Sequence, residues 1–341
     1  MSAFTSSCYD DETERDMMSV PVSLYIPVEN GNDLKSPGDP GTTEQFSLPE
    51  YAYVYIVLTY TKDSETKTEI FPYTYNLDPS KWEKITYSGS LQQSGDYVYK
   101  YNDQMLIYLP LGANRHWGRV YAAVSKMPLS ISSLPGTLIG DNATTMENYV
   151  KNLTFNAGAD NLRNNMQDIY STPYNYTLGD PAKYYGTIMN IGSPDMSVNL
   201  MLYHVAAKVD LIWNVDSDTQ SDLRITEVQA RNQFGGQAFL FRPCENERSS
   251  DANSYHTTLV SDDANAVGSQ WLGRAYYYTI PFKDTRTSNT FNISVSFKNG
   301  ANDKYYTPVF SQTIADNTVF TPWVRGNINF QTATHFTQDN P

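Results

Sequence analysis

Residues 199–215 read NLMLYHVAAKVDLIWNV, and this stretch decides the fold class. Apolar side chains occupy every odd position from Met201 to Val215. A two-residue period is typical of a β-strand that buries one face. The run is long enough for two strands joined at a bend, and we expect its odd positions to face a core.

The same period occurs near the N-terminus. Apolar residues stand at every second position there: Val20, Val22, Leu24, Ile26 and Val28. The pattern predicts a first strand with one buried face. Pro21 and Pro27 fall between these positions and favour a sheet edge, because proline has no N–H to donate to a neighbouring strand.

Other segments also indicate strands. Residues 51–60, YAYVYIVLTY, are apolar on both faces and predict a central strand covered on both sides. Further strands are expected at 67–75, 104–109, 119–125 and 291–297, and one or two short helices within 144–169. Aromatic residues make up 13% of the chain and charged residues 18%, a balance that favours strands. We therefore expect an all-β fold with minor α content, built as β-sandwiches.

The 341 residues suffice for two domains of ordinary size. Turn-forming residues punctuate the chain up to Pro194, where we place the domain boundary. The predicted parts are a polar N-terminal segment, 1–18, an N-terminal sandwich, 19–194, and a C-terminal sandwich, 195–341. The odd positions of 201–215 are expected to face the core of the second sandwich.

Several function classes are disfavoured. The net charge of −13 opposes binding to nucleic acid, which requires clustered Lys and Arg. The chain has no nucleophile elbow, phosphate-binding loop or zinc-binding histidine pair, so we expect no enzyme and no cofactor. No run of about 18 apolar residues occurs, so any membrane attachment is expected through a lipid or a partner.

A metal site is not expected either. The four histidines are scattered, and His204 fits a surface or interface position better than a ligand. Acidic and amide residues between Asp216 and Glu227 partly match a calcium loop. Ser221 stands where that loop needs glycine, so a solvated acidic turn is the preferred interpretation and calcium the alternative.

Several segments resemble the fimbrillin family of Bacteroidales surface fimbriae. The matching segments are Cys8 followed by acids, SVPVSLYIPV at 19–28, GDPGTTEQF at 38–46 leading into YAYVYIVLTY, GRVYAAVS at 118–125, and HVAAKVDLIWNV at 204–215. The resemblance implies two tandem β-sandwich domains of fimbrillin type. It also implies export as a lipoprotein to the outer-membrane surface, and a fimbrial or adhesive role with other fimbrial subunits as partners.

In that family a protease cuts after a basic residue in the loop that follows the first strand, and a strand of another subunit fills the vacated groove. By resemblance, Cys8 is the lipidation site, Lys35 the processing site and Arg15 its runner-up. Lys35 departs from the arginine that is usual in the family. The alternatives are an ordinary N-terminus and a solvated loop lysine.

The strand that we expect to be removed is the first, from Val20 to Val28. The best-patterned donor strand lies near the C-terminus, with Val324, Ile328 and Phe330 on its apolar face. A second function stays open, because abundant tyrosine, tryptophan and acidic residues could line a sugar groove: a surface protein that binds or processes glycans. Such aromatic residues also fit a sandwich core.

Overall fold

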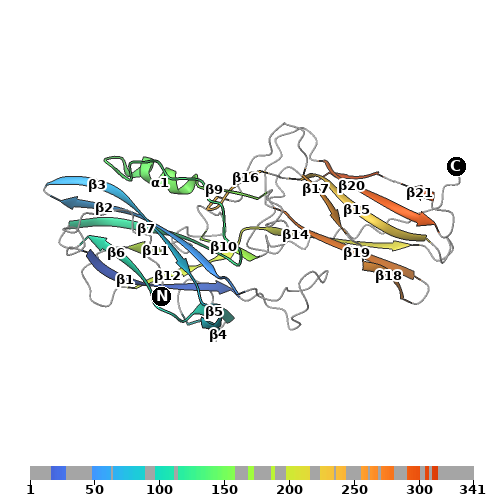
Figure 1. The fold of residues 1–341 in the computed structure, drawn as a ribbon, viewed down its shortest axis with the longest axis horizontal. Coiled ribbons are helices and arrows are strands. Elements are labelled where there is room, and N and C mark those ends of the chain that lie inside the picture. Colours follow the sequence, from blue (N-terminus) through green and yellow to red (C-terminus); the bar gives the residue numbers. More distant parts are fainter. Residues whose placement is uncertain are drawn as a thin grey trace.

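The computed structural model describes residues 17–27, 48–62, 64–88, 97–110, 114–157, 168–172, 186–188, 197–215, 223–233, 236–242, 255–259, 262–267, 270–279, 290–299, 304–306 and 309–313. Among these residues, strands dominate and one short α-helix occurs, so the predicted all-β fold with minor α content is confirmed. Figure 1 shows strands β1 to β7 at one end of the molecule and β15 and β17 to β21 at the other.

Among the described residues, the first half contains two large sheets and one small one. One has five strands in the order β12-β1-β5-β4, with β6 also paired to β1. Its strands are β1 (Met17–Pro27), β4 (Trp82–Thr86), β5 (Tyr97–Tyr101), β6 (Met105–Pro110) and β12 (Val198–Met201). A single 3₁₀ turn, Pro79–Lys81, precedes β4 and is capped by Asp78.

The other sheet has seven strands in the order β13-β10-β7-β2-β3-β8, with β11 also paired to β7. Its strands are β2 (Tyr51–Lys62), β3 (Glu65–Asn76), β7 (Asn114–Ser125), β8 (Ile139–Gly140), β10 (Ile169–Ser171), β11 (Gly186–Ile188) and β13 (Tyr203–His204). As predicted, β2 is central: it pairs with β3 on one side and β7 on the other.

The two sheets face each other across an apolar core, which makes the first half a β-sandwich. Inward side chains of β1, β5 and β6 meet those of β2 and β7 there. The opposite face of the seven-stranded sheet carries a second core. The helix α1 (Ala143–Lys151) packs into it through Met146 and Val150, together with Leu240 and Phe241.

The helix lies at the start of the predicted helical region, begins one residue before it, and has a polar cap, where the Asn142 side chain accepts the N–H of Thr145 at 3.0 Å. Ile169, however, which we expected on a helix, begins strand β10 and pairs with Ser125. Pairing with a distant strand overrides its helical spacing. After the helix, β9 (Thr154–Asn156) pairs with β16 (Gln237–Phe239) in a small two-stranded sheet.

The prediction that β1 is an edge strand is wrong. Its Val22–Tyr25 segment pairs in parallel with β12, while β6 and β5 pair antiparallel along its other edge. The C=O of Leu106 accepts a hydrogen bond from Tyr75 and therefore points away from β1. In antiparallel strands, two paired residues turn their backbone groups either toward each other or apart. Pro21, which pairs with Leu106, therefore turns its backbone away from β6. By alternation Pro27 has the same orientation. The two prolines therefore flank the segment that pairs with β12, where no N–H is required of them.

The run 199–215 divides between two parts of the molecule. Met201 and Val205 are buried among residues of the first half, as are the even positions Leu202 and Ala206. The expectation that all odd positions face the second core is therefore wrong for Met201 and Val205. Only β14 (Ala207–Val215) enters the sheets of the second half. The domain division near Pro194 stays a prediction.

The second half also consists of two sheets. One has the order β14-β19-β18, and the other β17-β15-β20-β21 with β22 paired to β20. Besides β14, the strands are β15 (Leu223–Gln233), β17 (Tyr255–Leu259), β18 (Asp262–Val267), β19 (Gln270–Thr279), β20 (Thr290–Asn299), β21 (Lys304–Tyr306) and β22 (Val309–Thr313). No helix among the described residues is long and apolar enough to cross a membrane.

Candidate functional site: the groove that holds the first strand

Strand β1 presents its apolar face to the sandwich core. Val20, Val22, Leu24 and Ile26 are between 0% and 4% exposed, as the two-residue period predicted. Full burial of such side chains stabilises a fold by about 1.5–3 kcal/mol each, so these four contribute roughly 6–12 kcal/mol as an upper estimate. The first strand is thus a major component of this core.

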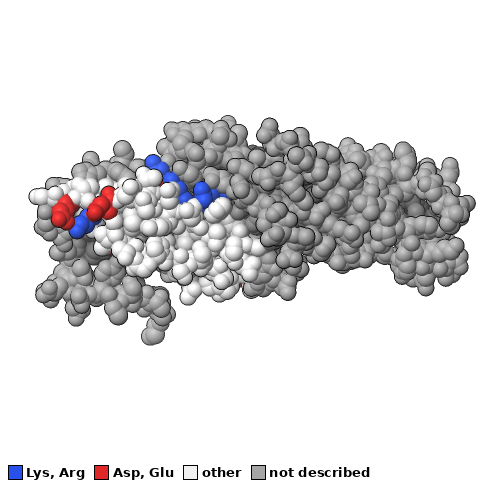
Figure 2. Space-filling model, turned by 90° about the horizontal axis from the view of Figure 1, so that it is seen from above, with Lys and Arg blue, Asp and Glu red and all other residues white. Residues whose placement is uncertain are grey.

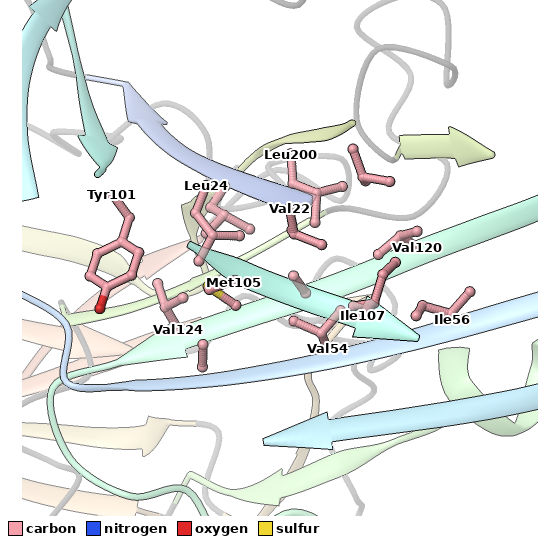
Figure 3. Close-up of a cluster of buried hydrophobic side chains, with 14 of the residues drawn as sticks. Val22, Leu24, Val54, Ile56, Tyr101, Met105, Ile107, Val120, Val124 and Leu200 are labelled. Atoms are coloured by element: carbon pink, nitrogen blue, oxygen red, sulfur yellow. The ribbon is translucent and has the colours of Figure 1, made fainter. Parts of the chain in front are cut away.

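The groove around β1 has a floor and two walls. Figure 3 shows Val22 and Leu24 pointing toward Val54, Ile56, Val120 and Val124 of the facing sheet, which form the floor. Met105, Ile107 and Leu109 of β6 form one wall, and Val198 and Leu200 of β12 form the other. All of these residues are buried, so without β1 the groove would expose a continuous apolar surface.

Both edges of β1 are paired. β6 pairs with Met17 to Val22, β5 with Tyr25 to Pro27, and β12 with Val22 to Tyr25. The C=O of Tyr25 also accepts the N–H of Leu202 at 2.8 Å. Removing β1 would leave these backbone groups of the walls without partners, and each such buried group costs about 1–3 kcal/mol. An empty groove therefore strongly favours any strand that can refill it.

The outer face of β1 carries an aromatic contact. Tyr25 packs edge-on against Tyr87, with ring centroids 5.4 Å apart, and the Lys100 ammonium lies 6.0 Å from the Tyr25 ring centre. Val98 and Met201 are buried beside these rings. An occupant of the groove is therefore constrained at this outward position as well as on its inward face.

The outer edge of β6 is closed by two tyrosines of β3. Tyr73 Oη donates to the C=O of Tyr108 at 2.7 Å and accepts the N–H of the same residue at 3.1 Å. Tyr75 Oη donates to the C=O of Leu106 at 2.5 Å. Burial raises the pKa of the Tyr75 hydroxyl, with smaller contributions from Tyr73 and Tyr108.

A buried charged cluster lies on the opposite face of the seven-stranded sheet, away from the groove. The Glu147 carboxylate of α1 accepts from Tyr121 Oη at 2.5 Å and from Arg119 at 2.8 Å, and Lys151 Nζ lies 3.3 Å away. Burial, followed by the charge of Glu147, raises the pKa of Tyr121. These contacts fix α1 to the sheet, and each member of the cluster has a structural partner.

Among the described residues, surface charge is sparse on the side where Figure 1 places α1. Figure 2 looks onto that side, and most of the described surface there is neither acidic nor basic. Among the described residues, no group of three or more His, Cys, Asp or Glu could hold a metal ion. His204 is half-buried on β13, with its ring 4.4 Å from that of Tyr170.

Several predicted site residues lie outside the described residues: Cys8, Arg15, Val28, Lys35, Val324, Ile328 and Phe330, as well as most of the calcium-like stretch. Their roles stay predictions. Sequence reasoning placed strands at β6 and β1 but missed that they pair, and it missed Tyr73 and Tyr75. The apolar run 105–109 indicated a strand in the sequence, but not its partner.

Among the residues whose side-chain burial the structure describes, exposed tyrosines do not gather on one element. They lie on three elements: Tyr97 on β5, Tyr108 on β6 and Tyr149 on α1. Many other tyrosines are buried in the two cores, for example Tyr53, Tyr55 and Tyr121. Most aromatic side chains whose burial the structure describes therefore serve packing.

No protein-family model and no curated protein matches the chain. It is similar to a solved structure of a candidate cell adhesion protein from Bacteroides eggerthii, with 14% identity, a TM-score of 0.41, and 87% of this chain and 81% of that one covered. It is also similar to the fimbrial anchor protein Mfa2 from Porphyromonas gingivalis, with 12% identity, a TM-score of 0.35, and coverage of 89% and 88%.

A third similar structure is the tip fimbrial protein Mfa3 of the same organism, with 12% identity, a TM-score of 0.36, and coverage of 86% and 82%. These three structures are described as a cell adhesion protein and two fimbrial proteins.

Proposed function

We propose that this chain is a non-enzymatic fimbrial subunit or surface adhesin that assembles by exchange of its first strand. Proteolysis in the segment between β1 and β2 separates β1 from the rest of the chain. A strand of another subunit then takes its place in the groove. The partner is a second copy or a related subunit, and no cofactor is needed.

The observation that carries the proposal is the position of β1. It is the first strand of the described chain, yet it lies inside its sheet and fills the core with four buried side chains. A single cut between Pro27 and Tyr51 therefore separates a complete core element from the fold. A strand in the middle of the chain would need two cuts.

Energetics explain why exchange is favoured over simple loss. The vacated groove would expose apolar walls and unpaired backbone groups together, and an incoming strand satisfies both. Its inward positions must carry apolar side chains at every second residue. The run that contains Val324, Ile328 and Phe330 meets this requirement by sequence.

Limited trypsin treatment followed by gel electrophoresis without boiling tests the proposal. We expect ladders of oligomers after cleavage at Lys35, and loss of the ladders in Lys35→Ala or after deletion of the residues that follow Val324. Cleavage at Lys35 that releases β1 and leaves only monomer would contradict it. Cleavage after Arg15 would leave β1 in place and serves as the internal control.

Attachment and location form a separate part of the proposal. We infer a lipid on Cys8 of the exported precursor and a place on the outer-membrane surface or in a fimbrium. Metabolic labelling with a lipid probe should lose its signal in Cys8→Ala. Labelling that persists in this variant would contradict the proposed lipid on Cys8 but would leave the proposed strand exchange unaffected.

A further inference from the structure

Strand β6 is held along its two edges by different means. Its inner edge pairs with β1 from Met105 to Pro110. Within the described residues, β1 is its only partner strand. Any event that removes β1 therefore takes away the whole sheet pairing of β6, although β6 is itself a wall of the groove.

The outer edge of β6 is bound by side chains. The Tyr108 N–H and C=O both bond to Tyr73 Oη, and the Leu106 C=O bonds to Tyr75 Oη. Backbone groups of successive residues alternate in direction along a strand. Met105, Ile107 and Leu109 therefore turn their N–H and C=O groups toward β1, while Leu106 and Tyr108 turn theirs toward the tyrosines.

The backbone of the two tyrosines is held in a sheet that does not include β1. They belong to β3, which pairs with β2 along its whole length, from Tyr51↔Asn76 to Lys62↔Glu65. Their rings stack on each other, with centroids 6.2 Å apart and planes 18° apart. Strand β3 lies in the sheet that faces β6, so its contacts with β6 bridge the two layers of the sandwich.

We propose that Tyr73 and Tyr75 are positioning residues that hold β6 in place when β1 is absent, so that β6 is the docking strand for the replacement. The incoming strand then pairs antiparallel with the free backbone groups of Met105, Ile107 and Leu109. The same hydroxyls close the outer edge of β6 to strand addition, which directs a partner to the groove. This inference rests on the proposed strand exchange.

The first test measures amide hydrogen exchange in the intact full-length chain. In Tyr73→Phe the Tyr108 amide loses its acceptor, and we expect its exchange to accelerate roughly threefold to tenfold, the scale of one net hydrogen bond. The Ile107 amide, which points toward β1, should exchange as in the parent. Tyr53→Phe is the matched control, because Tyr53 Oη accepts the N–H of Leu129 in the other core. Unchanged exchange at Tyr108 would overturn the inference.

The second test follows strand replacement in the full chain with a specific protease site placed within residues 36–41. After cleavage, excess fluorescent peptide of residues 17–27 is added and its uptake is measured. We expect uptake by the parent and by Tyr53→Phe, and at least about tenfold slower uptake by the Tyr73→Phe/Tyr75→Phe double variant. The double variant loses three hydrogen bonds, and their combined net loss corresponds to at least such a factor.

The two tests separate the possible failures. Equal uptake by the parent and the double variant would overturn the positioning role while leaving strand exchange intact. A cleaved parent that takes up no peptide would refute strand exchange, and with it the docking role of β6. The exchange rate of the Tyr108 amide would still show whether the tyrosine hydroxyls protect the outer edge of β6.

Discussion

Individual side chains on β1 contribute unequally to the free energy of unfolding, according to how deeply each is buried. Leu24 is fully buried between the two sheets, whereas Ser19 on the same strand is exposed. We expect Leu24→Ala to lower the free energy of unfolding by about 2–5 kcal/mol, through lost burial and the cavity left behind. Ser19→Ala should leave it nearly unchanged. Denaturant midpoints measure both, and a Leu24→Ala midpoint equal to the parent's would mean that β1 is not part of the core.

Buried tyrosines make the stability of the protein depend on alkaline pH. Burial and the nearby Glu147 raise the pKa of Tyr121 above its ordinary value of 10. Below pH 10 the hydroxyl is protonated in both states, so it contributes no pH dependence. Above pH 10 the unfolded chain loses this proton first, and stability falls by up to about 1.4 kcal/mol per pH unit. Unfolding free energies measured between pH 9 and 11 should fall less steeply in Tyr121→Phe, and an equal slope would contradict this assignment.

At the scale of the element, the alternation along β1 should decide whether a strand can occupy the groove. A chain that lacks residues 1–27 should regain stability when a peptide of residues 17–27 is added. A peptide with Val22→Ser and Leu24→Ser keeps its length but loses two inward apolar side chains. We expect it to bind at least about a hundredfold more weakly, from roughly 1.5–3 kcal/mol per side chain. Titration calorimetry measures both, and equal binding would mean that the inward face does not select the occupant.

The sequence predicted this element well and its neighbours poorly, for a physical reason. Period-2 patterning is local, so it identified the buried positions Val20 to Ile26 on β1. The pairing of Val22 with Val198 joins residues far apart in the chain, and nothing local encodes it. The prolines therefore suggested an edge, although they only flank the segment that pairs with β12. In the same way, alternation in the run 199–215 indicated burial but could not say which core each residue joins.

At the scale of the whole molecule, a core of the first half includes residues that come later in the chain than some strands of the second half. Phe241 comes after β15, yet it is fully buried between Tyr55 and Tyr121, with ring centroids 5.8 and 5.5 Å away. We expect Phe241→Ala to destabilise the first half by about 3–5 kcal/mol. Amide exchange should accelerate in β2 and β7. Acceleration confined to residues after 242 would contradict this assignment of Phe241 to the first core.

The central claim is that β1 must leave its groove for subunits to join, and a reversible lock tests it most directly. Ser19 and Tyr108 are exposed and lie opposite each other on β1 and β6. Their backbone groups point apart, and the Cα atoms of such a pair lie close enough for a disulfide. The lock is Ser19→Cys with Tyr108→Cys, in a chain whose Cys8 and Cys244 are replaced by serine. After cleavage between β1 and β2, we predict only monomer under oxidising conditions and oligomer ladders once the disulfide is reduced. Ladders that form equally well with the disulfide intact would contradict the account.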